Sequence, residues 1–204
     1  MDSIDTNWSI ESLQTLYKIS TAINAASTRQ ELLSDFTDVF TRNVEVEAGL
    51  VRLLTDDGWM EIVASHGIDK DKLNNFHRTP IDGSMFSRSS TTVGESMESF
   101  LREIVEDDSL TIYAIPVRYH VRTHGVINLY SNTRKKLPAE THRLWIAAGE
   151  HLAQALDRFI EDSEQKQLLI QNERNIIANE LHDSLAQTLA SLRFQVRVLD
   201  QALQ

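Results

Sequence analysis

The spacing of apolar residues separates a first part with mixed patterns from a last part with one helical pattern. From residue 8 to residue 42, apolar side chains recur every three or four positions, which is typical of amphipathic helices. Ser27 and Thr28 interrupt this pattern, and Glu31 follows at the spacing of a capping box. We therefore expect two helices here, the second restarting with a cap.

Four shorter runs have the apolar and β-branched character of strands: residues 48–55, 59–65, 110–119 and 124–131. Asp57 and Gly58 lie between the first two runs and give a tight-turn signal. The last two runs predict a second hairpin, with its turn at residues 121–123. Two antiparallel pairs are thus expected.

The segment between the two hairpins is less regular. Residues 69–76 and 96–105 have helical spacing, whereas residues 79–93 are rich in Ser, Thr and Gly and are expected to form a loop. Helices arranged around antiparallel hairpins indicate an α+β domain with a central antiparallel sheet.

The last part of the chain predicts one long helix. All three prolines and all seven glycines lie at or before Gly149, and Pro138 suits the start of a helix that would continue to Gln204. Near its end, apolar residues recur at alternating steps of four and three: Leu185, Leu189, Leu192, Val196, Leu199 and Leu203. Such a seam requires a partner helix, so we expect a parallel homodimeric coiled coil.

Earlier in the same helix a similar stripe is formed by Leu152, Leu156, Phe159 and Ile160. We expect it to continue the coiled coil. Residues 161–167 are polar, and the register is not continuous, so a stutter is expected near 161–181.

Composition narrows the classes of function. The chain has 204 residues, 41% of them hydrophobic, and a net charge of −10, which argues against a general nucleic-acid or anionic-membrane binder. It has no cysteine, which excludes thiolate metal sites, a Cys nucleophile and thioether-linked chromophores. No apolar run reaches the ~20 residues of a membrane span, and the N-terminus has no signal-peptide pattern. We expect a cytoplasmic portion, of a parent protein that is either membrane-anchored or cytoplasmic.

The strand motifs resemble those of GAF domains, small sensory modules with a central antiparallel sheet. The resemblance is carried by Leu50 to Leu54, Asp57-Gly58, Ala64 to Gly67, Ala114 to Val117 and His124 to Leu129. It covers about residues 10–160 and implies a GAF-like sensory domain, with PAS domains as the structural alternative. The ligand of such a domain, and whether it has one, stays open.

Residues 173–189 resemble the H-box of sensor histidine kinases, in the nitrate/nitrite-sensor type in which Asp directly follows His. The matching residues are Glu173, Arg174, Ile177, Ala178, Glu180, Leu181, His182, Asp183, Gln187 and Leu189. The family pattern has Arg where this chain has Asn179. The resemblance implies three domains or linkers: a GAF-like domain over 1–137 and part of the following helix to about 160, a signalling linker at 161–172, and the first phosphotransfer helix at 173–204.

The same resemblance assigns roles to four residues. His182 is the phosphoacceptor, and Asp183 is the general base that takes a proton from the imidazole. Gln187, four residues after Asp183, positions water for phosphatase activity, and Glu180 is a supporting charge. The implied partners are a second copy of the chain, a response regulator and the ATP-binding domain of the parent kinase.

The chain contains no glycine-rich phosphate loop, so no cofactor is expected in this fragment, and ATP and Mg²⁺ are assigned to a missing domain of the parent. We expect the fragment to be inactive alone. The alternative function is a non-enzymatic GAF and coiled-coil dimerisation module of a transcription regulator or adaptor, in which His182 and Asp183 belong to a solvated helix face.

Other histidines and aromatic residues are further candidates for ligand binding. His120 and His124 have a spacing that suits a metal pair on a helix, but here they flank a predicted turn, and no metal site is expected. His66 and His77 are candidates to line a domain pocket or bind haem, although His66 beside Gly67 is typical of a turn. Trp59, Phe86 and Trp145 suit a pocket or, more simply, a core.

Overall fold

The computed structural model describes residues 8–44, 46–73, 78–80, 101–104, 110–132 and 138–202. The chain divides into two compact units, Met1–Phe159 and Ile160–Gln204. The first unit is an α+β domain with a five-stranded sheet, and the second is helical. Among the described residues, no helix combines the length and apolarity needed to span a membrane.

The sheet of the first unit is antiparallel throughout, in the order β3-β2-β1-β5-β4. Its strands are β1 (Ala48–Leu54), β2 (Trp59–His66), β3 (Arg78–Pro80), β4 (Thr111–Tyr119) and β5 (Arg122–Ser131). The two predicted hairpins are thus β1–β2 and β4–β5, and the central pair β1–β5 joins them.

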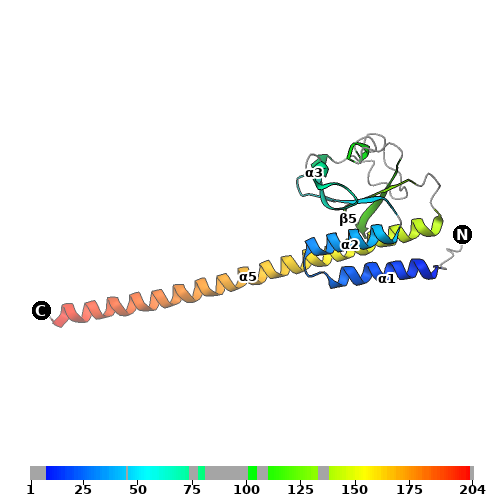
Figure 1. Ribbon diagram of the computed structural model, residues 1–204. Helices are drawn as coiled ribbons and strands as arrows, with labels where there is room; N and C mark the ends of the chain where they lie inside the picture. The colour runs from blue at the N-terminus through cyan, green and yellow to red at the C-terminus, as the bar shows by residue number, and fades with distance from the viewer. Residues whose placement is uncertain are drawn as a thin grey trace. The chain divides into compact units, whose positions relative to one another are not determined.

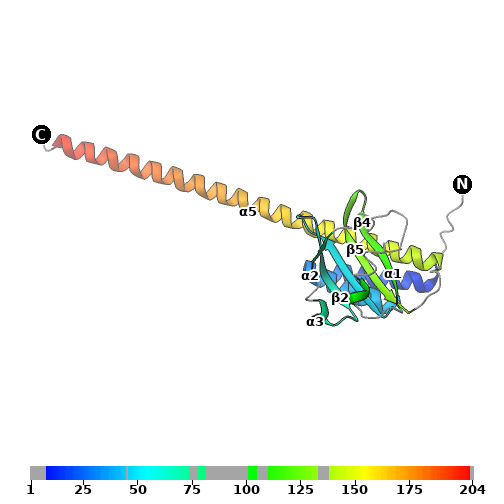
Figure 2. The same cartoon turned by 90° about the horizontal axis from the view of Figure 1, so that it is seen from above.

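Helix α2 (Arg29–Asn43) and the first part of α5 (Ala139–Ala202) cover one face of the sheet, and α1 (Ile10–Ala25) packs against α2 on the same side (Figures 1 and 2). The main core lies between these layers. It includes Ile19, Phe36, Phe40, Val51, Ile115, Ile127, Leu129, Trp145, Leu152 and Leu156. Trp145 is therefore a core residue, whereas Trp59 is 41% exposed.

The break between α1 and α2 has a clear local cause. The Thr28 side chain accepts a hydrogen bond from the Glu31 backbone N–H, and the Glu31 side chain accepts one from the Thr28 N–H, which completes a capping box. At the start of α1, the Ser9 side chain caps the helix by accepting from the Ser12 N–H. The expected restart at Thr28 is confirmed.

Helix α5 begins directly after Pro138, whose carbonyl oxygen accepts the His142 N–H at 3.0 Å. Gly149 allows the helix to approach the sheet closely, because a Cβ at this position would come within 2.5 Å of the Pro116 carbonyl oxygen. The helix contains 64 residues, which agrees with the expected uninterrupted helix over the part of the chain that is described.

The spacing of the upstream stripe alone predicted a coiled coil, but the stripe packs into the core of the first unit instead. Leu152 and Leu156 are buried in the core of the first unit, and Phe159 packs against that core. An apolar stripe at helical spacing only requires an apolar partner, and here the chain's own sheet provides it.

The second face of the sheet carries a smaller apolar cluster. It consists of Ala48, Leu50, Ile62, Leu101, Ile104, Leu110, Ile112 and Tyr130, with Ile68 and Leu73 at its margin. The short helix α3 (Lys70–Leu73) lies on this side, within the predicted segment 69–76.

Two predictions of local structure were wrong. Thr79 and Pro80 belong to β3 rather than to a loop, because they pair with Met60 and Trp59 at the open edge of β2. The β4–β5 turn consists of His120 and Val121 instead of residues 121–123, and His120 adopts a positive φ of 51°. Residues 81–93 and the predicted helical segment 96–100 lie outside the described residues.

Candidate functional site

A buried polar cluster occupies the second face of the sheet. Arg52 and Asn128 are fully buried, and Arg52 donates from Nε to Asn128 Oδ1 at 3.0 Å and from Nη1 to Thr79 Oγ1 at 3.3 Å. Burial lowers the pKa of Arg52 to about 10, and Tyr130, on the same face, has its pKa raised by burial. The sequence signal for this cluster is a charged residue, Arg52, inside the apolar run Leu50 to Leu54, which was expected to be a strand and not a polar site.

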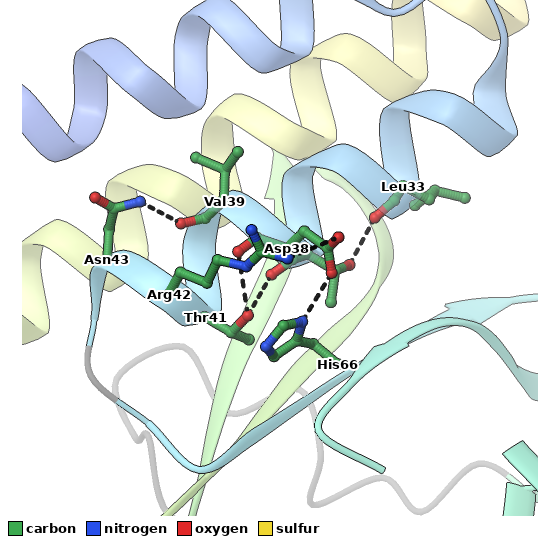
Figure 3. A network of polar contacts seen from close by, with 8 residues as sticks. Leu33, Asp38, Val39, Thr41, Arg42, Asn43 and His66 are labelled. Carbon is green, nitrogen blue, oxygen red and sulfur yellow. Dashed lines mark hydrogen bonds and ion pairs between the residues drawn. The ribbon is translucent and has the colours of Figure 1, made fainter. Parts of the chain in front are cut away.

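His66 lies in a polar network at the end of β2 (Figure 3). Its Nδ1 is 2.8 Å from Asp38 Oδ1 of α2, and Arg42 lies 3.7 Å from the other oxygen of that carboxylate. Thr41 and Asn43 of α2 donate hydrogen bonds to backbone carbonyls one turn earlier. The His66–Asp38 contact joins α2 to the end of β2. His77 lies outside the described residues.

His120 and His124, the two histidines with metal-pair spacing, make separate contacts. His124 Nε2 lies 3.0 Å from Asp157 Oδ1 of α5, while His120, in the turn, contacts the Tyr119 ring. His120 and Tyr119 also line a groove of about 360 Å³ with Arg118, Glu150, His151 and Gln154. Within the described residues, no group of three His, Cys, Asp or Glu side chains is arranged to hold a metal ion.

The four predicted chemical residues all lie on α5 in the second unit, and all are exposed. At about 100° per residue, Asp183 and Gln187 lie ~40° apart around the helix, and Glu180 lies within ~60° of both. The structure thus places these three polar groups on one helix face. It shows no hydrogen bond between them among the described contacts.

A stripe of apolar residues lies on a different face of the same segment. Ile177, Leu181, Leu185, Leu189 and Leu192 are between 49% and 65% exposed. The first four are spaced by four residues, so the stripe turns by about 40° at each step instead of following a strict heptad. The side chains of Val196, Leu199 and Leu203, which belong to the predicted seam, lie outside the described ones.

His182 is placed at the margin of this stripe. It lies about 60° from Leu185 around the helix, whereas Asp183 lies about 160° from it. An imidazole at the edge of an apolar stripe, followed directly by a carboxylate on the outer face, is accessible and has a proton acceptor in the next residue. Such an arrangement suits a nucleophile that receives a phosphoryl group.

The segment of α5 that contains His182 matches a known family model. The family model described as HisKA_3, histidine kinase, matches residues 173–204. Residues 173–204 are thus similar to the histidine kinase family. The resemblance drawn from the residues around His182 is thereby confirmed, and the HisKA_3 segment includes all four residues to which it assigned roles.

A curated relative supports the same conclusion. The chain is 42% identical over 67 residues to "Sensor protein NarQ homolog" of Haemophilus influenzae. The matched stretch is 33% of this chain and 12% of that relative, so the chain spans only a small part of the relative's length.

Solved structures establish the fold of the first unit. A GAF domain of a phosphoenolpyruvate-protein phosphotransferase from Acinetobacter superimposes with a TM-score of 0.60 at 15% identity, over 74% of this chain and 95% of that domain. A GAF domain from Pseudomonas syringae pv. tomato, described as part of a sensor histidine kinase, gives 0.53 at 16% identity over 79% and 92%. The expected GAF-like fold is confirmed, and the PAS alternative is set aside.

Proposed function

We propose that this chain is the sensory and phosphoacceptor portion of a two-component sensor histidine kinase. The observation that carries the proposal is the HisKA_3 segment, in which His182 borders an exposed apolar stripe and Asp183 and Gln187 share the outer face. The exposed stripe supports pairing of two copies, because large apolar side chains spaced along a helix are stabilised by a partner helix. The match to the HisKA_3 family model, which a plain dimerisation module would not require, favours the kinase.

In the proposed reaction, one imidazole nitrogen of His182 attacks the γ-phosphorus of ATP. The N–P bond forms as the bond to the ADP oxygen breaks, and ADP leaves. The other imidazole nitrogen loses its proton to Asp183, which keeps the phosphorylated ring neutral. Asp183 directly follows His182 on the exposed helix, about 100° further around its axis, and is the carboxylate next to the imidazole in the sequence.

The opposing activity, dephosphorylation of the response regulator, is assigned to Gln187. In a complex with a response regulator, its amide would orient a water molecule toward the aspartyl phosphate of the regulator, so that the acyl phosphate is hydrolysed. Glu180 lies on the same outer face and would act as a supporting charge. A regulator must then dock on this face, opposite the apolar stripe.

ATP and Mg²⁺ supply the phosphoryl group and its charge neutralisation when they are bound by a further domain of the parent protein. The residues of this chain contribute the nucleophile, the proton acceptor and the water-positioning amide. We therefore expect this chain, purified alone, to incorporate no label from γ-labelled ATP.

The test uses the parent protein with γ-labelled ATP. We expect label that is stable in base and lost in acid, as a phosphorus–nitrogen bond predicts. His182→Gln should abolish it, whereas His151→Gln, a matched change at another exposed histidine of α5, should leave it unchanged.

Two further variants separate the assigned roles. Asp183→Asn should lower the rate of autophosphorylation by about 10²-fold or more, the usual contribution of a general base. Gln187→Ala should reduce dephosphorylation of the regulator and retain autophosphorylation. Label that persists in His182→Gln would refute the assignment of the phosphoacceptor.

A further inference from the structure

Asp157 of α5 contacts two residues at the start of β5. Its Oδ1 lies 3.0 Å from His124 Nε2 and 3.4 Å from Arg122 Nη1. The side chains of Asp157 and His124 are 18% and 9% exposed, so their contact is largely shielded from water. We call Asp157, His124 and Arg122 the Asp157 clamp. It joins the sheet to α5 two residues before the first unit ends at Phe159.

A β-bulge directs His124 toward α5. The register between β4 and β5 shifts here and leaves His124 opposite no residue of β4, between the pairs Val117–Gly125 and Arg118–Thr123. Strict alternation along β5 would place this imidazole on the second face of the sheet, away from α5. Bulges re-aim side chains in this way and are common beside functional sites. The local backbone is therefore built to bring His124 to the helix.

The charges of the clamp allow it to open. Burial lowers the pKa of His124, and Arg122 and Arg29 of α2 lower it further, although Asp157 opposes them. The neutral imidazole leaves Arg122 as the charged partner of Asp157 within the clamp, and the Arg122 side chain is 57% exposed. Ion pairs with an exposed partner contribute little to stability. The clamp can thus break while the apolar core stays intact.

The strand that carries the clamp also contacts the buried polar cluster. Asn128 Oδ1 accepts a hydrogen bond from Arg52 Nε at 3.0 Å. At Gly125, directly after His124, an added Cβ would overlap the carbonyl oxygen of Arg52. Strand β5 is therefore packed tightly against β1 beside the clamp, and a displacement of the cluster acts on β5 at that point.

Beyond the first unit, α5 offers more than one apolar side to a partner helix. Every side chain from residue 161 to residue 189 is exposed. Leu168, Leu169 and Ile170 are 61%, 68% and 52% exposed, and at about 100° per residue they span about 200° around the helix. A two-stranded coiled coil buries a single stripe. Rotation of α5 therefore exchanges one buried apolar side chain for another, which gives two packings at this level.

We propose that the Asp157 clamp sets the rotation of α5 where the helix leaves the first unit, and thereby selects which of residues 168–170 faces a second copy of the chain. This rests on the proposed function, in which two copies pair through α5. A closed clamp holds one rotation, and an open clamp releases the other. The rotation decides whether His182 is presented to the ATP-binding domain or Gln187 to the response regulator, and so regulates the balance of the two activities.

The parent kinase tests this regulation through the ratio of His182 autophosphorylation to regulator dephosphorylation. Asp157→Asn keeps the size of the side chain and removes its charge, and we expect it to change the ratio at least several-fold. Loosening of the domain alone would lower both rates together and keep their ratio. Asp162→Asn, the same change at an exposed position of α5, is the matched control and should keep the native ratio. Equal ratios in the two aspartate variants would contradict the clamp.

Two further variants test whether the effect passes through this contact. Arg122→Gln changes a largely exposed side chain, so the domain should fold, and we expect it to shift the ratio in the same direction as Asp157→Asn. His124→Gln combined with Asp157→Asn should change the ratio no more than Asp157→Asn alone, because changes that act through one contact are not additive. Additive effects would show that the two residues act separately and would overturn the clamp.

Cysteine cross-linking of the whole chain measures the rotation without any activity. The chain has no native cysteine, so Leu168→Cys, Leu169→Cys and Ile170→Cys each introduce one thiol. Under mild oxidation, the position that faces its copy should form disulfide-linked dimers about ten-fold faster than the other two, because only facing Cβ atoms reach bonding distance. We expect a different position to be fastest once Asp157→Asn is added.

The outcomes separate the clamp from the proposed function. The same fastest position with and without Asp157→Asn would overturn the clamp and leave the α5 dimer intact. Absence of cross-linked dimers at all three positions would contradict the pairing of α5, and the clamp mechanism with it. A parent protein without label on His182 would refute the phosphoacceptor, whereas the cross-links would still show whether the clamp rotates α5.

Discussion

Asp157 is an acidic residue of α5 that contacts the β4–β5 hairpin. Its Oδ1 lies 3.0 Å from His124 Nε2 and 3.4 Å from Arg122 Nη1. His124 is only 9% exposed, and burial lowers its pKa below the ordinary value, although Asp157 opposes that shift and Arg122 adds to it. The folded domain therefore favours the neutral imidazole of His124. Its partner Asp157 lies two residues before Phe159, where the first unit ends.

This lowered pKa predicts a loss of stability in acid. Since unfolded His124 titrates near its ordinary value of about 6.5, the unfolded state binds more protons just below that pH. The contribution of His124 is thus complete above pH 6.5 and is lost as the pH falls toward its folded pKa. Urea unfolding at pH 7.5 and pH 5 should show a larger drop for the native chain than for His124→Gln.

The matched control for this titration is His151→Gln. His151 is an exposed histidine of α5, whereas His124 is buried in β5. An equal drop in the native chain and in His124→Gln would assign the acid sensitivity to other groups.

At the scale of elements, the capping box at the start of α2 is open to a direct test. Thr28→Ala removes the hydroxyl that accepts the Glu31 N–H, and we expect it to lower the free energy of unfolding by about 1 kcal/mol. Ser27→Ala is the neighbouring control and should change it by less than ~0.5 kcal/mol, because only the backbone of Ser27 contacts Glu31. Denaturant midpoints of the two variants decide the matter, and equal midpoints would contradict the capping role.

The elements that sequence predicted well are those with local causes. The restart at Thr28, the turn at Gly58 and the helix after Pro138 each follow from a residue whose preference acts within a few positions. The pairing of β3 with β2 has no such signal, because Thr79 and Pro80 become a strand only through a distant edge.

The candidate site was predicted unevenly for the same reason. The residues around His182 lie along one helix, so their spacing in the sequence directly gives their relative directions. The cluster of Arg52, Thr79 and Asn128 combines three strands, and only the strand order brings them together. Leu152 and Leu156 show the converse, since a correct helical pattern did not reveal whether its partner was a second chain or the chain's own sheet.

At the scale of the whole molecule, the proposed function requires communication between two units that share one helix. Residues 161–167 are polar, and the apolar stripe around Leu181 and Leu185 departs from a strict heptad. A departure from the heptad locally changes the winding of a coiled coil, and under the proposed function a rotation at this point would change how His182 meets its ATP-binding partner. The phase of α5 between the units is then the variable that carries the signal.

Insertions near Ser163 in the parent kinase test this variable. Two extra residues rotate everything downstream by about 200°, whereas seven extra residues restore the phase to within about 20° and only lengthen the helix. We expect the two-residue insertion to change the ratio of autophosphorylation to regulator dephosphorylation at least several-fold, and the seven-residue insertion to keep it near the native ratio. Equal ratios in all three proteins would show that helical phase does not couple the units, even if His182 remains the phosphoacceptor.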